Sequence, residues 1–303
     1  MARLSPALVA VSALAAALAL PAAAQRVPVG VTVVGGSVTG LAQFEAGLDR
    51  GGDVEMAGAI VTAQAYHQFA PTFGAGLSLN YTYEDWSFSS VRGLLGTAPW
   101  GELHRPQLGA PMVWTPQAGT TVLVNPTVSW SYEQGADTSD ALVWGALFGV
   151  TRQFSPDLTL GLGVGVFDDL EETRAFPVLL VDWRIDERWR LANPYRAGPS
   201  GGAGLELAYK FNDEWEFGGG GTWRSVRFRL DDTGPVPGGI GESRSVPLFL
   251  RTTWLASRDV RLDFYAGAAV GGNLKLMDRA GNDLADEDVD TAPFVGVTLR
   301  TRF

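Results

Sequence analysis

The stretch APFVGVTLRTRF, residues 292–303, alternates between apolar and polar side chains up to the last residue of the chain. In a β-strand successive side chains point to opposite sides, so this alternation places the two kinds of side chain on two faces. One face suits an apolar surrounding and the other suits a polar interior. The apolar face carries Val295, Val297, Leu299 and Phe303, and the polar face carries Gly296, Thr298, Arg300 and Arg302.

The same alternation recurs along the rest of the chain. Its cleanest example is residues 73–84, where Leu77, Leu79 and Tyr81 share one face. No helical periodicity of more than two turns follows residue 25, which indicates an all-β fold. The predicted strands are 38–49, 55–69, 73–84, 102–114, 120–132, 141–154, 158–169, 176–185, a short strand from 189, 203–211, 215–230, 243–255, 260–276 and 292–303.

The connections between these runs alternate between tight turns and longer loops. An even number of strands joined in this way is typical of an antiparallel transmembrane β-barrel with both ends on one side. We therefore expect about fourteen strands, or twelve if the weak runs near Leu108 and Leu191 are loops. Tight turns are predicted at 70–72, 116–119, 155–157, 186–188, 212–214 and 257–259.

The amino terminus predicts export. Residues 1–24 combine a basic start, an apolar run and a small-residue cleavage pattern, which together indicate a signal peptide. We expect residues 25–37 to be a periplasmic lead-in and residues 38–303 to form the barrel. Nothing downstream offers about twenty consecutive apolar residues, which a membrane-spanning helix needs.

Composition excludes several classes of function. The chain has no Cys, so disulfide scaffolds, thiolate metal sites and Cys nucleophiles are ruled out together. A net charge of −10 argues against binding of nucleic acid. The 38 glycines and 10 tryptophans fit a curved sheet with aromatic residues at two membrane interfaces. No cofactor is expected.

The carboxy-terminal strand resembles that of bacterial outer-membrane β-barrel proteins, through Gly296, Leu299 and Phe303. The resemblance implies that these residues form the signal read by the barrel-assembly machinery during insertion, and it places the protein in the cell outer membrane, in contact with lipid and lipopolysaccharide. The chain resembles outer-membrane barrels of a poorly characterised family, and in size it is similar to the monomeric porins. The oligomeric state stays open.

The predicted inner faces carry charges of both signs, which suggests two functions. The charges could project into water and form the filter of a passive pore for small solutes. They could instead pair and close the lumen of a structural or adhesion barrel. The candidate lumen residues are Arg251, Arg261, Asp263, Arg300, Arg302, Asp182, Arg184, Glu206 and Lys210.

An enzyme is disfavoured, and no catalytic residue is assigned. Outer-membrane phospholipases and barrel proteases resemble this architecture and use a His near the outer rim, but the chain has only His67 and His104. His67 is predicted near a periplasmic turn, and His104 has no Ser close to it in the sequence. The acidic run 278–290 lacks the spacing of a calcium-binding loop, so we expect a solvated loop and no metal site.

Overall fold

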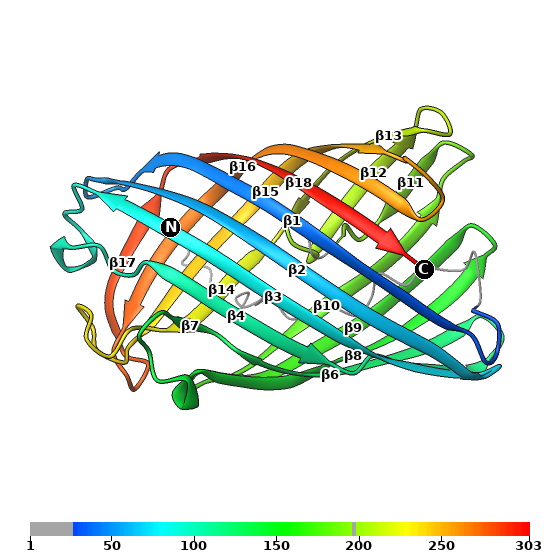
Figure 1. Cartoon of the computed structure of the whole chain (residues 1–303), viewed down its shortest axis with the longest axis horizontal. Coiled ribbons are helices and arrows are strands. Elements are labelled where there is room, and N and C mark those ends of the chain that lie inside the picture. Colours follow the sequence, from blue (N-terminus) through cyan, green and yellow to red (C-terminus); the bar gives the residue numbers. More distant parts are fainter. Residues whose placement is uncertain (1–26, 196–197) are drawn as a thin grey trace, which may run out of the picture.

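The chain forms a closed antiparallel barrel of fourteen strands (Figure 1). The structure is a computed structural model and describes residues 27–195 and 198–303. The predicted signal peptide, residues 1–24, lies outside the described residues. Each strand pairs with the next one along the chain, and β18 pairs with β1 to close the barrel. The predicted fold class and the count of fourteen are confirmed.

Four of the fourteen strands are interrupted, so that the described chain contains eighteen strand segments. The interrupted strands are the pairs β4 and β5, β6 and β7, β13 and β14, and β17 and β18. The segments are β1 Thr32–Gly47, β2 Asp53–Ala70, β3 Phe73–Ser89, β4 Glu102–Gly109, β5 Met112–Gln117, β6 Thr120–Trp130, β7 Tyr132–Glu133, β8 Leu142–Ser155, β9 Leu158–Asp169, β10 Thr173–Arg184, β11 Trp189–Ala192, β12 Gly204–Lys210, β13 Trp215–Thr222, β14 Arg224–Arg229, β15 Ile240–Trp254, β16 Val260–Met277, β17 Asp283–Val289 and β18 Ala292–Arg302, with short 3-10 helices η1 Leu94–Gly96 and η2 Thr138–Ala141.

The two ends of the barrel differ. The turn end, to the right in Figure 1, carries the short connections, the start of β1 and the carboxy terminus. The loop end, to the left, carries the longer connections with η1 and η2. In the described part of the chain no helix is long and apolar enough to cross a membrane.

The outer surface is apolar and has aromatic residues concentrated near the turn end. The outward residues of β18 follow the predicted alternation, since Val295, Val297 and Leu299 are each a little over 40% exposed while Thr298 is fully buried. A concentration of exposed aromatic residues near one end of a barrel is typical of the interface between a bilayer and water. The exposed aromatic residues next to the short turns are Phe69, Phe73, Trp114, Phe154, Trp183, Trp189, Phe211, Phe217, Trp254 and Phe303.

Several segments differ from the predicted boundaries, and the largest differences are in β1 and in the acidic run 278–290. β1 begins at Thr32 instead of residue 38, so the predicted lead-in 25–37 includes six residues of strand that pair with β2. Gly35 and Gly36 concealed this part, because glycine contributes no side chain to an alternation. A bulge between Gln43 and Ala46 then reverses the faces, so Ala46, which an unbroken alternation would place outside with Ala42 and Phe44, lies inside the barrel.

The acidic run 278–290 is also more ordered than a solvated loop. Residues 283–289 form β17, which pairs with β16 and continues into β18. Only the connection from Asp278 to Asn282 is a turn. Asn273 on β16 donates hydrogen bonds to Asp286 and Asp288, so cross-strand contacts offset the crowding of like charges.

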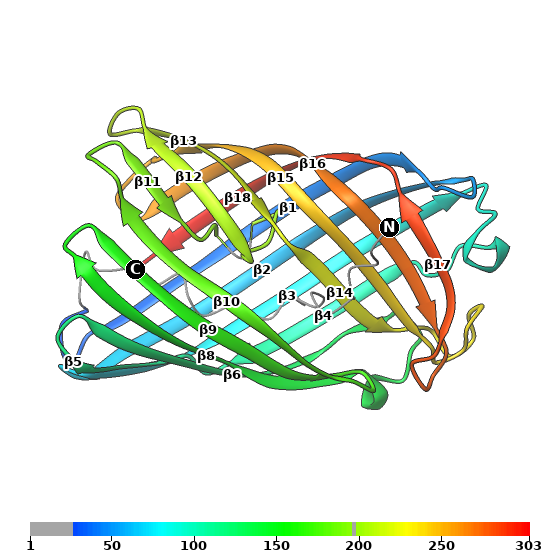
Figure 2. The ribbon, with the colours of Figure 1, turned by 180° about the vertical axis from the view of Figure 1, so that it is seen from behind.

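The strand pairing of the barrel wall is incomplete between β10 and β12 (Figure 2). β10 pairs with β9 from Thr173 to Trp183, but with β11 only from Asp182 to Arg184. Where that pairing stops, the Asn193 side chain takes the place of a neighbouring strand as hydrogen-bond partner of the β10 backbone. Its Oδ1 accepts the N–H of Val181 at 2.9 Å, and its Nδ2 donates to the carbonyls of Leu179 and Gly204 at 3.0 and 2.9 Å.

Pro177 lies two residues before Leu179 and therefore on the same edge of β10. Proline has no N–H, so this position adds no unpaired donor to an edge that faces no strand. The edge is at the depth of lipid-facing residues, since Pro177 is opposite Val164 and Leu179 is opposite Leu162. Asn193 and Pro177 together reduce the number of backbone hydrogen-bonding groups that this edge of β10 leaves unpaired.

Candidate functional site

β14 leaves the wall and crosses the lumen in the loop half of the barrel. The residues from Ser225 to Leu230 are all buried on both faces. One edge of β14 pairs with β15, whereas the other pairs with β7 and contacts Ser131, which lies between β6 and β7. The N–H of Arg229 donates to the Ser131 carbonyl at 2.9 Å, and the Ser131 hydroxyl donates to the Arg227 carbonyl. The break at Trp223 coincides with a change of phase in the sequence, where the apolar residues move from odd positions up to Trp223 to even positions from Val226 on; such a change predicts a bulge or a departure from the membrane.

The two faces of β14 differ in chemistry. Val226, Phe228 and Leu230 pack in an apolar cluster with inward residues of β2–β4 and β16 and with η1. The opposite face carries Ser225, Arg227 and Arg229, which face the loops and inner wall of β8–β10. A strand with one apolar and one cationic face thus divides the loop half of the lumen.

An ion-pair triad joins β14 to the far wall. Glu84 on β3 is almost fully buried and contacts the guanidinium groups of Arg105 on β4 and Arg224 on β14. The Trp86 indole also donates to Glu84, at 3.2 Å. Because β3 and β14 are far apart around the barrel, the pair between Glu84 and Arg224 spans the lumen.

A second network of charges lies on the inner wall nearer the turn end, where Arg251 on β15 is its centre. Its guanidinium pairs with Glu206 on β12, with Glu216 on β13 at 2.6 Å and with Asp263 on β16 at 3.3 Å. Asp263 is fully buried and also pairs with Arg300 at 2.6 Å. We call these five residues the Arg251 network.

The Arg251 network extends to the segment that follows β11. The Arg300 guanidinium lies over the ring of Tyr195, 4.5 Å from its centroid, and the Tyr195 hydroxyl donates to Ser37 on β1 at 2.8 Å. Pro199 lies against Gly296, where an added Cβ would stand 2.6 Å from the proline ring. The connection between β11 and β12 therefore turns into the barrel, and Gly296 provides the room.

Arg261 differs from its neighbours. It lies opposite Arg300 in the β16–β18 register and is exposed, and no carboxylate of the described residues lies within ion-pair distance of it. Of the nine residues predicted to line the lumen, the structure thus brings together Arg251, Asp263, Arg300 and Glu206, with Arg261 beside them.

The other four residues lie at the turn end and have mostly local contacts. Asp182 pairs with Arg190 of the neighbouring strand at 2.6 Å, and Arg184 pairs with Asp157 at 3.3 Å with both side chains about half exposed. Lys210 pairs with Asp213 of its own turn, and the backbone N–H of Arg302 donates to the Asp259 carbonyl.

Several interior charges were missed by the sequence reasoning. Arg174 is the second residue of β10 and pairs with Glu242 on β15 at 3.1 Å, but the predicted strand began at residue 176. Extending the alternation by two residues would have placed it inside. Arg105 lies on a strand of weak pattern, and Arg227 and Arg229 lie on β14, where no signal in the sequence shows that a strand crosses the lumen.

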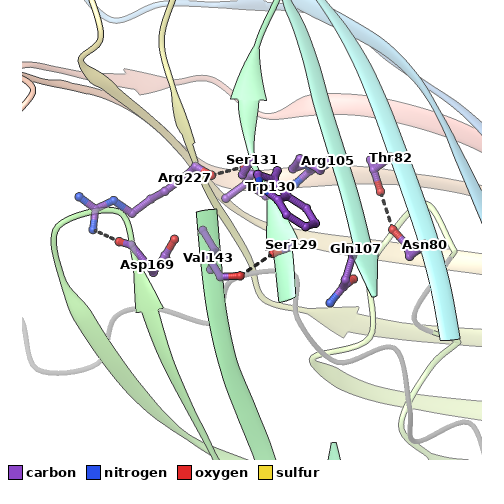
Figure 3. A pocket seen from close by; sticks show the side chains of 11 residues that line it. Asn80, Thr82, Arg105, Gln107, Ser129, Trp130, Ser131, Val143, Asp169 and Arg227 are labelled. Carbon is purple, nitrogen blue, oxygen red and sulfur yellow. Dashed lines mark hydrogen bonds between the residues drawn. The ribbon is translucent and has the colours of Figure 1, made fainter. Parts of the chain in front are cut away.

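A pocket with a volume of about 40 Å³ remains in the lumen between β14 and the wall of β3–β9 (Figure 3). Thr82, Gln107 and Ser129 reach it from the wall, while Arg227 reaches it from β14. The wall side is a ladder of uncharged polar groups, because inward positions of β3 and β6 carry amides and hydroxyls. The pocket is a candidate solute site.

Each of the two histidine rings shares a hydrogen bond with a hydroxyl group of a neighbouring strand. The His67 ring shares a 2.8 Å hydrogen bond with the Thr32 hydroxyl, and the His104 ring shares one of 2.8 Å with the Tyr81 hydroxyl among further tyrosine rings. Among the described residues no group of three or more His, Asp or Glu is arranged to hold a metal ion.

A closed antiparallel barrel with an apolar outer surface and a charged interior defines a membrane β-barrel, and the resemblance to bacterial outer-membrane barrels predicted from the sequence is confirmed. The chain belongs to the family described as a domain of unknown function (DUF6268), whose model matches residues 123–302. No curated protein matches the sequence.

Solved structures with a similar fold include the COG4313 outer membrane channel from Pseudomonas putida F1, with 10% identity and a TM-score of 0.49 over 93% of this chain and 99% of that one. The toluene transporter TodX from P. putida has 10% identity and a TM-score of 0.42 over 90% of each chain. The porin KdgM has 9% identity and a TM-score of 0.34 over 86% of this chain and 97% of that one.

Proposed function

We propose that the protein is an outer-membrane channel for small hydrophilic solutes, with a lumen narrowed by β14. The pocket between β14 and the β3–β9 wall is the observation that carries this proposal. A barrel of eight strands is filled by its own side chains, whereas sixteen or more leave an aqueous channel. Fourteen strands enclose more space than wall side chains fill, and here an inserted strand takes up part of it.

The inner wall supports a path for polar solutes. Uncharged polar groups line it on β3, β4 and β6, and the Arg251 network lines it nearer the turn end. Arg261 is the charge of this region that is both exposed and without a carboxylate partner among the described residues. It is therefore the side chain best placed to select between cations and anions.

A second candidate is a structural or adhesion barrel with a closed lumen. The ion pair between Glu84 and Arg224 favours it, since this pair and the apolar cluster around Phe228 join opposite walls. Under either proposal we infer that the protein resides in the outer membrane after signal-directed export, is inserted through Gly296, Leu299 and Phe303, and is not an enzyme.

Planar-bilayer recording of the refolded protein separates the two candidates. A channel gives stepwise currents in the wild type, and in a salt gradient Arg261→Glu shifts the reversal potential toward cations. Arg258→Glu is the matched control, because it changes the same charge in an exposed turn outside the lumen. Absence of steps above the lipid background in folded wild-type protein would favour the closed barrel.

A further inference from the structure

The turn between β9 and β10 has a backbone conformation that its residues disfavour. The N–H of Asp169 donates to the Glu172 carbonyl at 2.8 Å, so Leu170 and Glu171 are the two central residues of a tight hairpin turn. Their φ angles are +50° and +69°, in the left-handed region. Turns with two positive φ angles favour Asn-Gly, because this backbone is strained for a residue such as Leu. Strain at two adjacent residues indicates that the turn is retained for what its side chains contact.

The side chains of this turn fasten β14. Leu170 is 4% exposed and packs in the apolar cluster on the inner face of β8–β10. The Glu171 carboxylate pairs with Arg229 on β14 at 3.0 Å, and the Glu172 carboxylate pairs with Arg227 at 2.9 Å. One segment of three residues thus supplies an apolar anchor and a carboxylate for each of the two arginines on the cationic face of β14.

The two sides of these ion pairs differ in exposure. The Arg227 and Arg229 side chains are 2% and 3% exposed, whereas Glu172 and Glu171 are 57% and 49% exposed. A guanidinium keeps its charge, so its burial is costly without a charged partner. The other hydrogen bonds of Arg229 go to backbone carbonyls, which do not neutralise it. Loss of the carboxylates therefore favours movement of the arginines into water.

We propose that the β9–β10 turn is a latch that keeps β14 across the lumen, and that the cationic face of β14 separates from the β8–β10 wall when the latch is released. The ladder between β14 and β15 serves as the hinge, since the break at Trp223 and the loop 231–239 leave both ends of β14 outside regular strands. Glu171 and Glu172 are reached from the loop end, whereas Glu84, which holds the other side of β14, is buried. The inference rests on the proposed channel only in naming the element that narrows it.

Thiol labelling of the full-length protein, refolded in a neutral detergent, tests the latch. The chain has no Cys, so Ser225→Cys places one reporter on the cationic face of β14, where Ser225 is fully buried. Adding Glu171→Gln and Glu172→Gln together removes both negative charges at nearly constant shape. We expect a water-soluble maleimide to label the reporter at least fivefold faster in that variant. Leu170→Gly, which removes the apolar anchor, should also quicken labelling and decides the question if the double variant does not fold.

Two controls separate release of the latch from other effects. Asp168→Asn removes a carboxylate from the same hairpin, but Asp168 is exposed on the outer face, so the Ser225 reporter should stay protected. Thr298→Cys places a reporter on β18, where Thr298 is fully buried, and its labelling should stay slow in the latch variants.

The proposal is overturned if the Ser225 reporter stays protected in both folded latch variants, or if the Thr298 reporter is quickened equally. Labelling needs no conductance, so a silent bilayer with a released Ser225 reporter would reject the channel and keep the latch. Stepwise currents with a protected reporter would reject the latch and keep the channel.

Discussion

At the scale of single residues, the interior depends on charges that are buried in matched sets. Arg251 is 7% exposed and contacts three carboxylates, of which Asp263 is fully buried. A buried charge that loses its partner keeps its desolvation cost without compensation. Arg251 on β15 therefore joins β15 to β12, β13 and β16. We expect its removal to lower the stability of the barrel whether or not the protein transports a solute.

Replacing Arg251 with Met should lower the free energy of unfolding by about 3–5 kcal/mol, because Glu206 and Glu216 lose their ion-pair partner. Arg184→Gln is the matched control, since its pair with Asp157 is half exposed and contributes about 0–1 kcal/mol. Urea unfolding of both variants in detergent, followed by the loss of heat-resistant gel migration, measures the difference. Equal stability of the two would contradict a structural role for the network.

At the scale of the element, three of the short turns share one hydrogen-bonding arrangement. In each of them the first residue of the turn accepts hydrogen bonds from the backbone N–H groups two and three positions later. Such local caps are the reason why Asp, Asn and Ser start turns so often. The three residues are Asp186, Asn212 and Ser257.

The Asp186 turn predicts a pH effect. The backbone N–H groups of Arg188 and Trp189 hold the pKa of the Asp186 carboxyl below its ordinary value of 3.8. A lowered folded-state pKa contributes stability that is present above the unfolded pKa and is lost as the pH falls through the folded one. Asp186→Ala should thus have a lower melting temperature than the wild type at pH 7. The difference in melting temperature between the two proteins should become smaller below about pH 4.

Asp186→Asn is the control for that experiment, because an amide oxygen accepts the same two bonds without titrating. Its difference from Asp186→Ala should persist at pH 3. Thermal melts from pH 3 to pH 7 measure all three proteins, and a constant gap between wild type and the Ala variant would refute the assignment.

The interrupted wall gives a second prediction at this scale. Asn193→Ala removes three side-chain hydrogen bonds that connect β10 with β12, so we expect a loss of about 1–3 kcal/mol. Hydrogen exchange at the Val181 amide should quicken, while exchange at Val143, in the paired β8, should not. Asn193→Asp keeps the acceptor for Val181 and loses both donors, and it should be intermediate. Unchanged exchange at Val181 in the Ala variant would show that Asn193 does not secure this edge.

At the scale of the whole molecule, closure depends on the two ends of the chain. β18 pairs with both β16 and β1, and the backbone of Phe303 exchanges two hydrogen bonds with Val34, at 2.7 and 3.0 Å. The Phe303 side chain is 79% exposed and packs little within the barrel. Its backbone and its ring therefore serve different purposes, which two variants can separate.

Deleting Phe303 removes both contributions, whereas Phe303→Ala keeps the backbone bonds and removes only the ring. If the ring is the insertion signal, both variants should fail to reach the outer membrane and should be degraded. Fractionation and heat-modifiable migration on gels measure the outcome. Normal levels of Phe303→Ala with loss of the deletion variant would assign the residue to barrel closure alone.

Much of the architecture is determined by local patterns. The alternation in residues 73–84 or 292–303 needs no distant contact to be recognised, because side chains on a strand have a period of two. Short turns such as 186–188 and 212–214 carry their own caps. For these reasons the strand count and the inward positions of Arg251 and Asp263 followed from the sequence.

The interior was decided only by the tertiary structure. The sequence around Val226 and Phe228 shows a change of phase, but whether such a strand stays in the wall depends on what lies across the lumen. Here Glu84 and the apolar residues of β2–β4 receive it. Likewise, nothing local shows that Gln107 and Arg227, 120 positions apart, face one pocket. Alternation assigns a side chain to the inside, and only closure of the barrel determines which inward side chains meet.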